Sequence, residues 1–174
     1  NVIINNDDNI IIGDNIANDP NIIIINDLDQ PLIIKVASLP GERLQVYFID
    51  NDEFFKRKTN VADDKGVDFN DNDERSMFFC RGVLETVKKL GWKPDVIHCH
   101  GWMTSLVPAY IKTTYKNDPT FKNAKVVYSV YENCFTEKLN ADLHKKAIMQ
   151  HMTAEDTKSF VGADNNSLHI GAIT

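Results

Sequence analysis

The stretch Pro94-Asp95-Val96-Ile97-His98-Cys99-His100-Gly101-Trp102 decides the fold class of this sequence. Its β-forming residues predict a short strand over 95–100, and the turn after it leads into a predicted helix over 102–115. A predicted helix over 71–90 precedes the strand, and a predicted strand over 125–131 follows the second helix. Strands and helices that alternate with a repeat of roughly 30 residues indicate right-handed βαβ units. We therefore expect an α/β fold with a Rossmann-like parallel sheet flanked by helices.

The helix over 71–90 carries the clearest local signals. Asp71 can cap its N-terminus, and Glu74, three residues later, would complete a capping box. Two lysines lie in the last turn, where the helix dipole favours cations, and Gly91 supplies a stop. The buried face is predicted from apolar residues at helical spacing, namely Met77, Cys80, Val83, Leu84, Val87 and Leu90.

The rest of the chain is expected to divide into two parts. Residues 1–30, which are rich in Asn, Asp and Ile, form an N-terminal segment that favours short strands or an ordered meander. Residues 31–174 form the Rossmann-like domain. In the helix over 102–115, Pro108 must cause a kink or divide the first turn. Further elements are expected over 32–37 and 44–49 (strands) and over 136–149 and 153–160 (helices).

Composition limits the classes of function. A chain of 174 residues has the length of one domain or of half a two-domain enzyme, and 43% hydrophobic and 25% charged residues are typical of a globular protein. A net charge of −6 argues against general binding to nucleic acid or anionic membranes, and no apolar run is long enough to cross a bilayer. The opening on Asn1 rather than Met suggests processing or a fragment.

The charge is distributed unevenly, with a net −10 over residues 1–74 and a net +4 over residues 75–174. This pattern is explained either by a solvated acidic face on the first part or by an anionic substrate facing the second. The cysteines lack C-x-x-C spacing, which argues against a disulfide framework or a four-thiolate zinc site and for a reduced, cytoplasmic compartment. They are Cys80, Cys99 and Cys134.

Ligands of parallel sheets bind beyond the carboxyl ends of the strands. That rule selects three places: His100-Gly101-Trp102, Tyr131-Glu132-Asn133, and Asp50 with Asn51. The imidazole in the first place could donate a hydrogen bond to a sugar hydroxyl or to a developing charge. The indole two residues later either stacks on a sugar ring or fills the space between helix and sheet.

Metal and nucleotide motifs give little support to other chemistries. His98 and His100 share one face of the predicted strand, and two ligands are too few for zinc, so we expect His98 to be satisfied inside the sheet and His100 to be exposed at its end. The D-x-D patterns at 50–52 and 71–73 are explained by turn and cap chemistry. The sequence contains no G-x-G-x-x-G, G-x-x-x-x-G-K or G-x-S-x-G motif. We expect no metal site.

Residues 91–108 read Gly-Trp-Lys-Pro-Asp-Val-Ile-His-Cys-His-Gly-Trp-Met-Thr-Ser-Leu-Val-Pro. They resemble a segment of the N-terminal domain of the bacterial-type glycogen and starch synthases, G-W-x-P-D-hydrophobic-hydrophobic-H-x-H-D-W-x-T/S-x-L-x-P. Three further stretches are similar to that family. They are Tyr47-Phe48-Ile49-Asp50-Asn51 with Phe54, Phe55 and Arg57; Asp71-Asn72-Asp73-Glu74-Arg75 with Phe78 and Phe79; and Lys125-Val126-Val127-Tyr128-Ser129-Val130. The similarity covers about residues 30–135.

The resemblance implies one half of a GT-B glycosyltransferase, in which two Rossmann-like domains face a cleft. Such an enzyme transfers glucose from ADP-glucose (or UDP-glucose) to the end of an α-1,4-glucan with retention, and it needs no metal or other cofactor. Its partners would be the sugar nucleotide and the glucan, without nucleic acid or membrane. The family's residues around the donor sugar map onto Asp71 and His100 as catalytic candidates, and the substrate-binding candidates are Trp102, Tyr131, Asp50 and Asn51.

The sequence also departs from the family pattern. Gly101 stands where the family has the aspartate of H-D-W, and Tyr131 stands where it has the histidine of T-I-H-N. The K-x-G-G-L loop and the Arg/Lys clamp on the diphosphate do not occur in this sequence. We therefore expect the chain by itself to bind the donor weakly and to transfer slowly or not at all. Two alternatives stay open, a degenerate domain that binds glucan or a partner, and a Rossmann-like domain of unrelated purpose.

Overall fold

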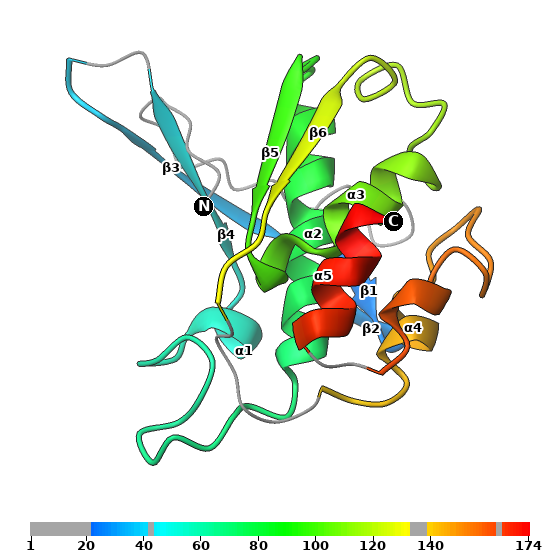
Figure 1. The fold of residues 1–174 in the computed structure, drawn as a ribbon. Coiled ribbons are helices and arrows are strands. Elements are labelled where there is room, and N and C mark those ends of the chain that lie inside the picture. The colour runs from blue at the N-terminus through cyan, green and yellow to red at the C-terminus, as the bar shows by residue number, and fades with distance from the viewer. Residues whose placement is uncertain (1–21, 42–43, 133–138, 163–164) are drawn as a thin grey trace. The chain divides into compact units, whose positions relative to one another are not determined.

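The computed structural model describes residues 22–41, 44–132, 139–162 and 165–174 (Figure 1). The chain forms two compact units, Asn1–Arg57 and Lys58–Thr174. The predicted boundary between residues 30 and 31 therefore falls inside the first unit. Among the described residues, no helix combines the length and the hydrophobicity that a membrane-spanning segment requires.

In its described residues, the first unit contains two antiparallel strand pairs and a short helix. Its elements are β1 (Ile22–Ile25), β2 (Leu28–Pro31), β3 (Ile33–Ser38), β4 (Gln45–Asp50) and α1 (Asp52–Phe55). In the β1–β2 pair, Asn26 and Asp27 occupy the turn with φ angles of 49° and 59°, which Asn and Asp tolerate better than most residues. The short strands expected within residues 1–30 are thus confirmed over 22–31, and residues 1–21 lie outside the described residues.

The strands expected over 32–37 and 44–49 are confirmed as β3 and β4, but they do not join a parallel sheet. They pair antiparallel, with Ile33 opposite Asp50 and Ser38 opposite Gln45. The connection between them is too short for a crossover, which a parallel pair would need. The strand before the long helix therefore belongs to a hairpin rather than to the βαβ series.

The second unit contains the predicted strand–helix alternation. Its elements are α2 (Asn72–Lys89), β5 (Val96–His100), η1 (Trp102–Thr104), α3 (Leu106–Lys112), β6 (Lys125–Ser129), α4 (Leu143–Lys146), η2 (Lys158–Phe160) and α5 (Asn165–Ile173). The two strands β5 and β6 pair in parallel, from Val96 opposite Lys125 to His100 opposite Ser129. This parallel pair with its crossover helix confirms the α/β fold class (Figure 1).

Helix α2 ends as its sequence predicts. Gly91 has a φ of 67°, and its N–H donates to the carbonyl of Lys88 at 2.9 Å, while the N–H of Trp92 donates to the carbonyl of Val87 at 3.2 Å. These two bonds form a Schellman motif, which needs a residue that adopts positive φ without strain. The predicted glycine stop is confirmed.

The start of α2 differs from its prediction. Asp71 occupies the N-cap position, but its φ of −105° and ψ of 16° are not the extended backbone that capping side chains need, and its carboxylate makes no capping hydrogen bond. The predicted capping box is therefore wrong. Glu74 instead lies 3.0 Å from the ammonium of Lys146.

The two helices expected near the C-terminal end are shorter than predicted. Within 136–149, the structure has helix α4 over four residues, and residues 136–138 lie outside the described part. Within 153–160, the carboxylate of Asp156 accepts hydrogen bonds from the N–H and the hydroxyl of Thr153 at 2.7 and 2.8 Å. These bonds resemble the cap that the sequence predicts at Thr153, but the segment contains turns and the short helix η2 instead of a helix over 153–160.

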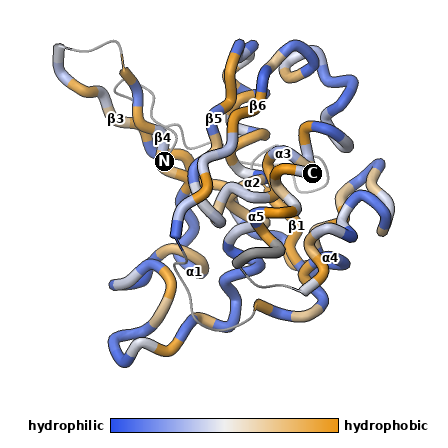
Figure 2. Tube along the Cα trace, viewed as in Figure 1, coloured by the Kyte–Doolittle hydropathy of each residue, from blue (hydrophilic) through white to orange (hydrophobic). Residues whose placement is uncertain are grey.

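The core of the second unit lies where α2, α3 and α5 pack together. The largest fully buried side chains of the second unit are Phe78, Met77, Leu84, Leu106, Val107, Tyr110, Phe121, Leu143, Phe160 and Leu168. Pro108 lies in the first turn of α3, where its missing N–H costs no helical hydrogen bond, and η1 forms a separate turn before it. The predicted division of this helix is confirmed. Figure 2 shows α3 as a hydrophobic segment and the loop that follows it as largely hydrophilic.

Cys80 belongs to this core, and burial raises the pKa of its thiol to about 12. The unfolded chain loses the thiol proton near its ordinary pKa, about 8.5, so the unfolded state binds fewer protons above that pH. We expect the free energy of unfolding to fall between about pH 9 and pH 12, with this thiol contributing about 1.4 kcal/mol per pH unit at most. Urea denaturation of the wild type and of Cys80→Ala across this range measures it. Equal slopes for both proteins would contradict the assignment.

Candidate functional site

The carboxyl end of β5 brings together two residues singled out from the sequence. The Nδ1 atom of His100 lies 2.8 Å from the hydroxyl of Tyr131, and the two rings stack with centroids 6.0 Å apart. Both side chains are exposed, with Tyr131 at 51% of its maximum. The parallel pairing explains this contact, because the carboxyl ends of neighbouring parallel strands lie at the same edge of the sheet.

Gly101 makes the sharp turn that follows His100. Its φ of 70° lies in the region that favours glycine, and a Cβ atom there would lie 3.4 Å from the ring of Tyr131. The turn is closed by hydrogen bonds to its carbonyl from the hydroxyls of Thr104 at 2.9 Å and Tyr128 at 3.1 Å. The positive φ, rather than a lack of space, is therefore the reason that glycine suits position 101.

Trp102 begins η1 directly after this turn and is only 5% exposed. Of the two roles considered for it, filling the space between helix and sheet agrees with this burial. Contact of Trp102 with a glucan stays a prediction.

His98 lies one rung before His100 on the same face, with ring centroids 4.0 Å apart, and its Nε2 atom lies 2.8 Å from the hydroxyl of Ser129. The imidazole therefore has the hydrogen-bond partner that was expected, but the side chain is exposed, so its expected place inside the sheet is wrong. Cys99 faces the other side and is buried, as strand alternation predicts. Across the described ranges, no group of three His, Cys, Asp or Glu side chains is placed to hold a metal ion.

The electrostatic surroundings favour the neutral form of His100. Desolvation and the nearby His98 lower the pKa of His100 below its usual range. A neutral imidazole carries one N–H. When the hydroxyl of Tyr131 donates to Nδ1, the proton is on Nε2, which can then donate to a ligand. With Nδ1 bonded to Tyr131, the Nε2 atom is the ring nitrogen left to bond a ligand, as a donor in this tautomer.

Asp71 lies at the start of α2, at the same end of the second unit as the carboxyl end of β5 (Figure 1). Helix α2 is joined to the turn after β5 by two bonds to the carbonyl of Met103, from the hydroxyl of Ser76 at 3.2 Å and the thiol of Cys80 at 3.1 Å. The structure thus places the start of the helix and the His100 turn in one packed region. Contact of both side chains with one ligand stays a prediction.

Asp50 and Asn51 belong to the first unit. The carboxylate of Asp50 forms an ion pair with Lys35 across the β3–β4 hairpin. Asn51 is 2% exposed, and its side-chain oxygen accepts a hydrogen bond from the N–H of Phe54 at 3.1 Å, which caps α1. Its amide group donates to Gln30 and to the carbonyl of Pro31, each at 3.1 Å. These contacts give Asn51 a role in the structure of this unit, and substrate binding by either residue stays a prediction.

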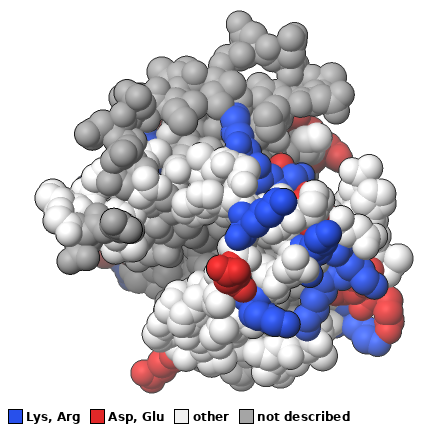
Figure 3. Space-filling model, turned by 90° about the horizontal axis from the view of Figure 1, so that it is seen from above, with Lys and Arg blue, Asp and Glu red and all other residues white. Residues whose placement is uncertain are grey.

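Basic side chains gather on one face of the molecule, with a few acidic ones among them (Figure 3). Among the basic residues of 75–174, Lys88 is compensated within the chain, since its ammonium lies 3.6 Å from Glu85 and 3.5 Å from Asp118. Both explanations of the positive charge of residues 75–174, a solvated face and an anionic ligand, are compatible with this arrangement.

The parallel strand pair, its crossover helix and the polar side chains at the strand ends define an α/β domain of the kind found in GT-B glycosyltransferases. The family model described as "Starch synthase catalytic domain" matches residues 14–174, and the chain belongs to this family.

Curated relatives agree with this assignment. The chain is 39% identical over 130 residues to a glycogen synthase of Chlorobium luteolum, a match that covers 67% of this chain and 27% of the relative. It is 37% identical over 150 residues to a glycogen synthase of Chlorobaculum tepidum, covering 84% of this chain and 30% of the relative. The chain thus matches less than a third of the length of these relatives.

A solved structure shows the same fold. The catalytic domain of starch synthase IV from Arabidopsis thaliana, bound to ADP and acarbose, matches with a TM-score of 0.59 and 22% identity, over 74% of this chain and 25% of that chain. The resemblance to glycogen and starch synthases seen in the sequence is confirmed.

Proposed function

We propose that this chain supplies part of the donor-sugar site of a retaining glucosyltransferase, which moves glucose from ADP-glucose (or UDP-glucose) to the end of an α-1,4-glucan. The hydrogen bond between His100 and Tyr131 at the carboxyl end of β5 is the observation that carries the proposal. It supports an imidazole held in one orientation, at the edge of the sheet where α/β folds bind ligands. Membership of the starch synthase family supports the reaction class.

The two catalytic candidates have separate roles in this proposal. The Nε2–H group of His100 donates to a hydroxyl or oxygen of the transferring glucose, and the bond strengthens as charge develops in the transition state. The carboxylate of Asp71 orients sugar hydroxyls or stabilises positive charge at the anomeric carbon. No metal or other cofactor takes part. Contacts to the diphosphate come from a second domain, and a cytoplasmic location fits a soluble sugar nucleotide.

Incorporation of radiolabelled glucose from ADP-glucose into glycogen tests this function in the full natural protein. Asp71→Asn removes the negative charge with little change in shape, and we expect it to lower kcat/KM by about 10- to 100-fold. Asp64→Asn changes an exposed aspartate of the same unit and is the matched control, expected to leave kcat/KM within about twofold. Equal activity of the two variants would remove Asp71 from the mechanism.

A second function, binding of glucan or a partner without catalysis, is favoured by the replacement of family residues at Gly101 and Tyr131. Retention of the full natural protein on a glycogen affinity gel, together with an absence of glucose incorporation, would support this alternative. Incorporation that depends on Asp71 would exclude it.

A further inference from the structure

Hydrogen bonds join the N-terminus of α2, where Asp71 lies, to the loop that precedes the helix. The side-chain amide of Asn72 donates to the carbonyl of Val61 at 2.8 Å, and the guanidinium of Arg75 donates to the carbonyl of Asn60 at 2.6 Å. Asn72 and Arg75 also bond each other at 2.6 Å, and both are buried. These contacts fix the helix start to residues that are near in sequence.

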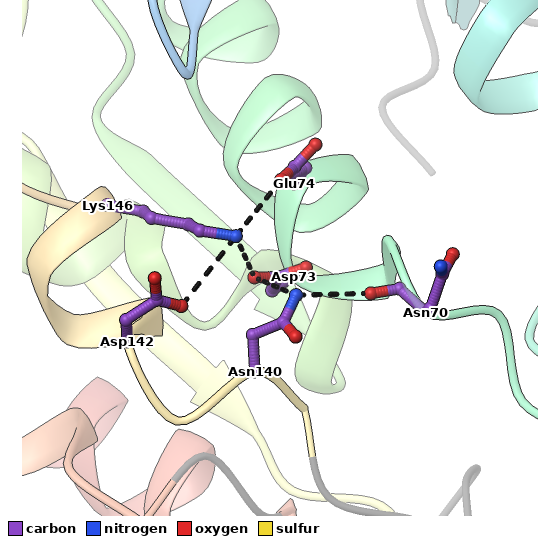
Figure 4. A network of polar contacts seen from close by, with 6 residues as sticks. All are labelled: Asn70, Asp73, Glu74, Asn140, Asp142 and Lys146. Carbon is purple, nitrogen blue, oxygen red and sulfur yellow. Dashed lines mark hydrogen bonds and ion pairs between the residues drawn. The ribbon is translucent and has the colours of Figure 1, made fainter.

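A distant segment holds the same helix start from a second direction (Figure 4). The side-chain amide of Asn140 donates to the carbonyl of Asn70 at 3.2 Å and to the carboxylate of Asp73 at 3.1 Å. The ammonium of Lys146 lies 3.3 Å from Asp73 and 3.0 Å from Glu74. The residue directly before Asp71 and the residue two places after it are thus both bound by the segment that contains α4.

Burial makes these bonds important for the local conformation. The side chain of Asp73 is 0% exposed, and within the described part of the chain its Oδ1 atom has no hydrogen-bond partner. A buried carboxylate is costly unless a cation or donor compensates it, so Lys146 and Asn140 are needed to keep Asp73 in place. Burial lowers the pKa of Lys146, but the bonds with Glu74 and Asp73 outweigh it and raise this pKa, so the cation is present at neutral pH.

We propose that Lys146 and Asn140 are positioning residues for Asp71. They hold the turn at residues 70–74 in the conformation in which the Asp71 carboxylate faces the donor sugar. The inference rests on the proposed function. Neither residue needs to touch substrate, because both act through the neighbours of Asp71 along the backbone. A displacement of about 1 Å at a reacting group can lower the rate strongly. Loss of a contact that fixes the backbone beside Asp71 can therefore lower the rate, although the contact does not touch the substrate.

Steady-state kinetics of the full natural protein test the inference. Lys146→Met keeps the length of the side chain and removes the charge, and we expect kcat/KM for ADP-glucose to fall about tenfold. Lys146→Arg should recover most of the loss, because it restores a cation near Asp73 and Glu74. Lys145→Met changes an exposed lysine of the same short helix and should leave kcat/KM unchanged.

A double-mutant cycle separates positioning from a general structural role. In an Asp71→Asn background the Lys146→Met change should cost less than about twofold, because the group that it positions is already lost. The same factor in both backgrounds, with every assay run well below the melting temperature of the least stable variant, would overturn the inference.

Amide hydrogen exchange gives a readout that does not depend on activity. The N–H groups of Asn72 and Arg75 bond the carbonyls of Phe69 and Asp71, and their exchange should be about tenfold faster or more in Lys146→Met than in Lys145→Met. Unchanged exchange would overturn the inference whatever the kinetics show. If the wild type transfers no glucose, the proposed function fails, and exchange alone decides whether Lys146 holds this turn.

Discussion

Replacement of His100 by alanine is expected to lower kcat/KM for glucosyl transfer by about 100- to 1000-fold in the full natural protein, which is the usual cost of losing one preorganised hydrogen-bond donor. The hydroxyl of Tyr131 lies 2.8 Å from Nδ1, and when it donates to this atom the imidazole carries its proton on Nε2, where it can donate to the sugar. Alanine removes the donor without disturbing a core, because the imidazole is exposed. Glucose incorporation measured over a range of donor concentrations gives kcat and KM separately.

His98→Ala is the matched control for this prediction, because His98 is an exposed histidine on the same face of the same strand. We expect its kcat/KM at neutral pH to stay within about twofold of the wild type. Equal losses for the two variants would show that the imidazole at position 100 has no special part in transfer.

The same control variant predicts a shift of the pH profile. Desolvation and the charge of His98 lower the pKa of His100, so removal of His98 raises it. If neutral His100 is the active form, activity falls as pH drops through this pKa, and the acid limb of the kcat/KM profile moves to higher pH in His98→Ala. An unchanged acid limb would assign that limb to another group.

Gly171→Ala is expected to destabilise the second unit by about 2 kcal/mol, although alanine is the better helix former. A Cβ atom at this position would lie 2.5, 2.6 and 2.7 Å from three atoms of the Phe160 ring, distances that real Cβ contacts do not reach. The ring is 0% exposed, so it has no room to move away. Chemical denaturation of wild type and variant gives the difference in unfolding free energy.

A double-mutant cycle with Phe160→Leu tests the cause of this loss. Leucine lacks the ring atoms that the added methyl group would meet, so the double variant should lose less stability than the sum of the two single variants. Additive losses would show that the methyl group is accommodated in another way and that close packing between α5 and η2 is not the reason.

Much of the second unit could be predicted from local sequence. The apolar spacing from Met77 to Val87 predicted α2, and Gly91 predicted its end, because helix periodicity and the requirement for positive φ are properties of a few neighbouring residues. Alternation along β5 predicted that His98 and His100 would share a face. The rule for parallel strands predicted that His100 and Tyr131 would lie at one edge, and the hydrogen bond between them agrees.

Other features depended on contacts between distant residues. The antiparallel pairing of β3 with β4 was not predicted. The short connection between Ser38 and Gln45 could have indicated it, because parallel strands need a longer crossover. Nothing in the sequence was a reason to predict a role for Lys146, because a lysine near other charged residues is most often a solvated surface group. Its pairing with Asp73 brings together side chains that are far apart in the chain.

The α/β class, the family and the ends of the strands could be predicted from local sequence, since each depends on residue types at short spacings. Which polar groups are buried, and which partners they bond, depends on the folded arrangement of distant segments. Asp73 is one such group, an unremarkable first-turn carboxylate until folding removes its water and sets Asn140 and Lys146 against it. Desolvation and partner choice depend on the whole packed arrangement, and for that reason local sequence patterns do not contain them.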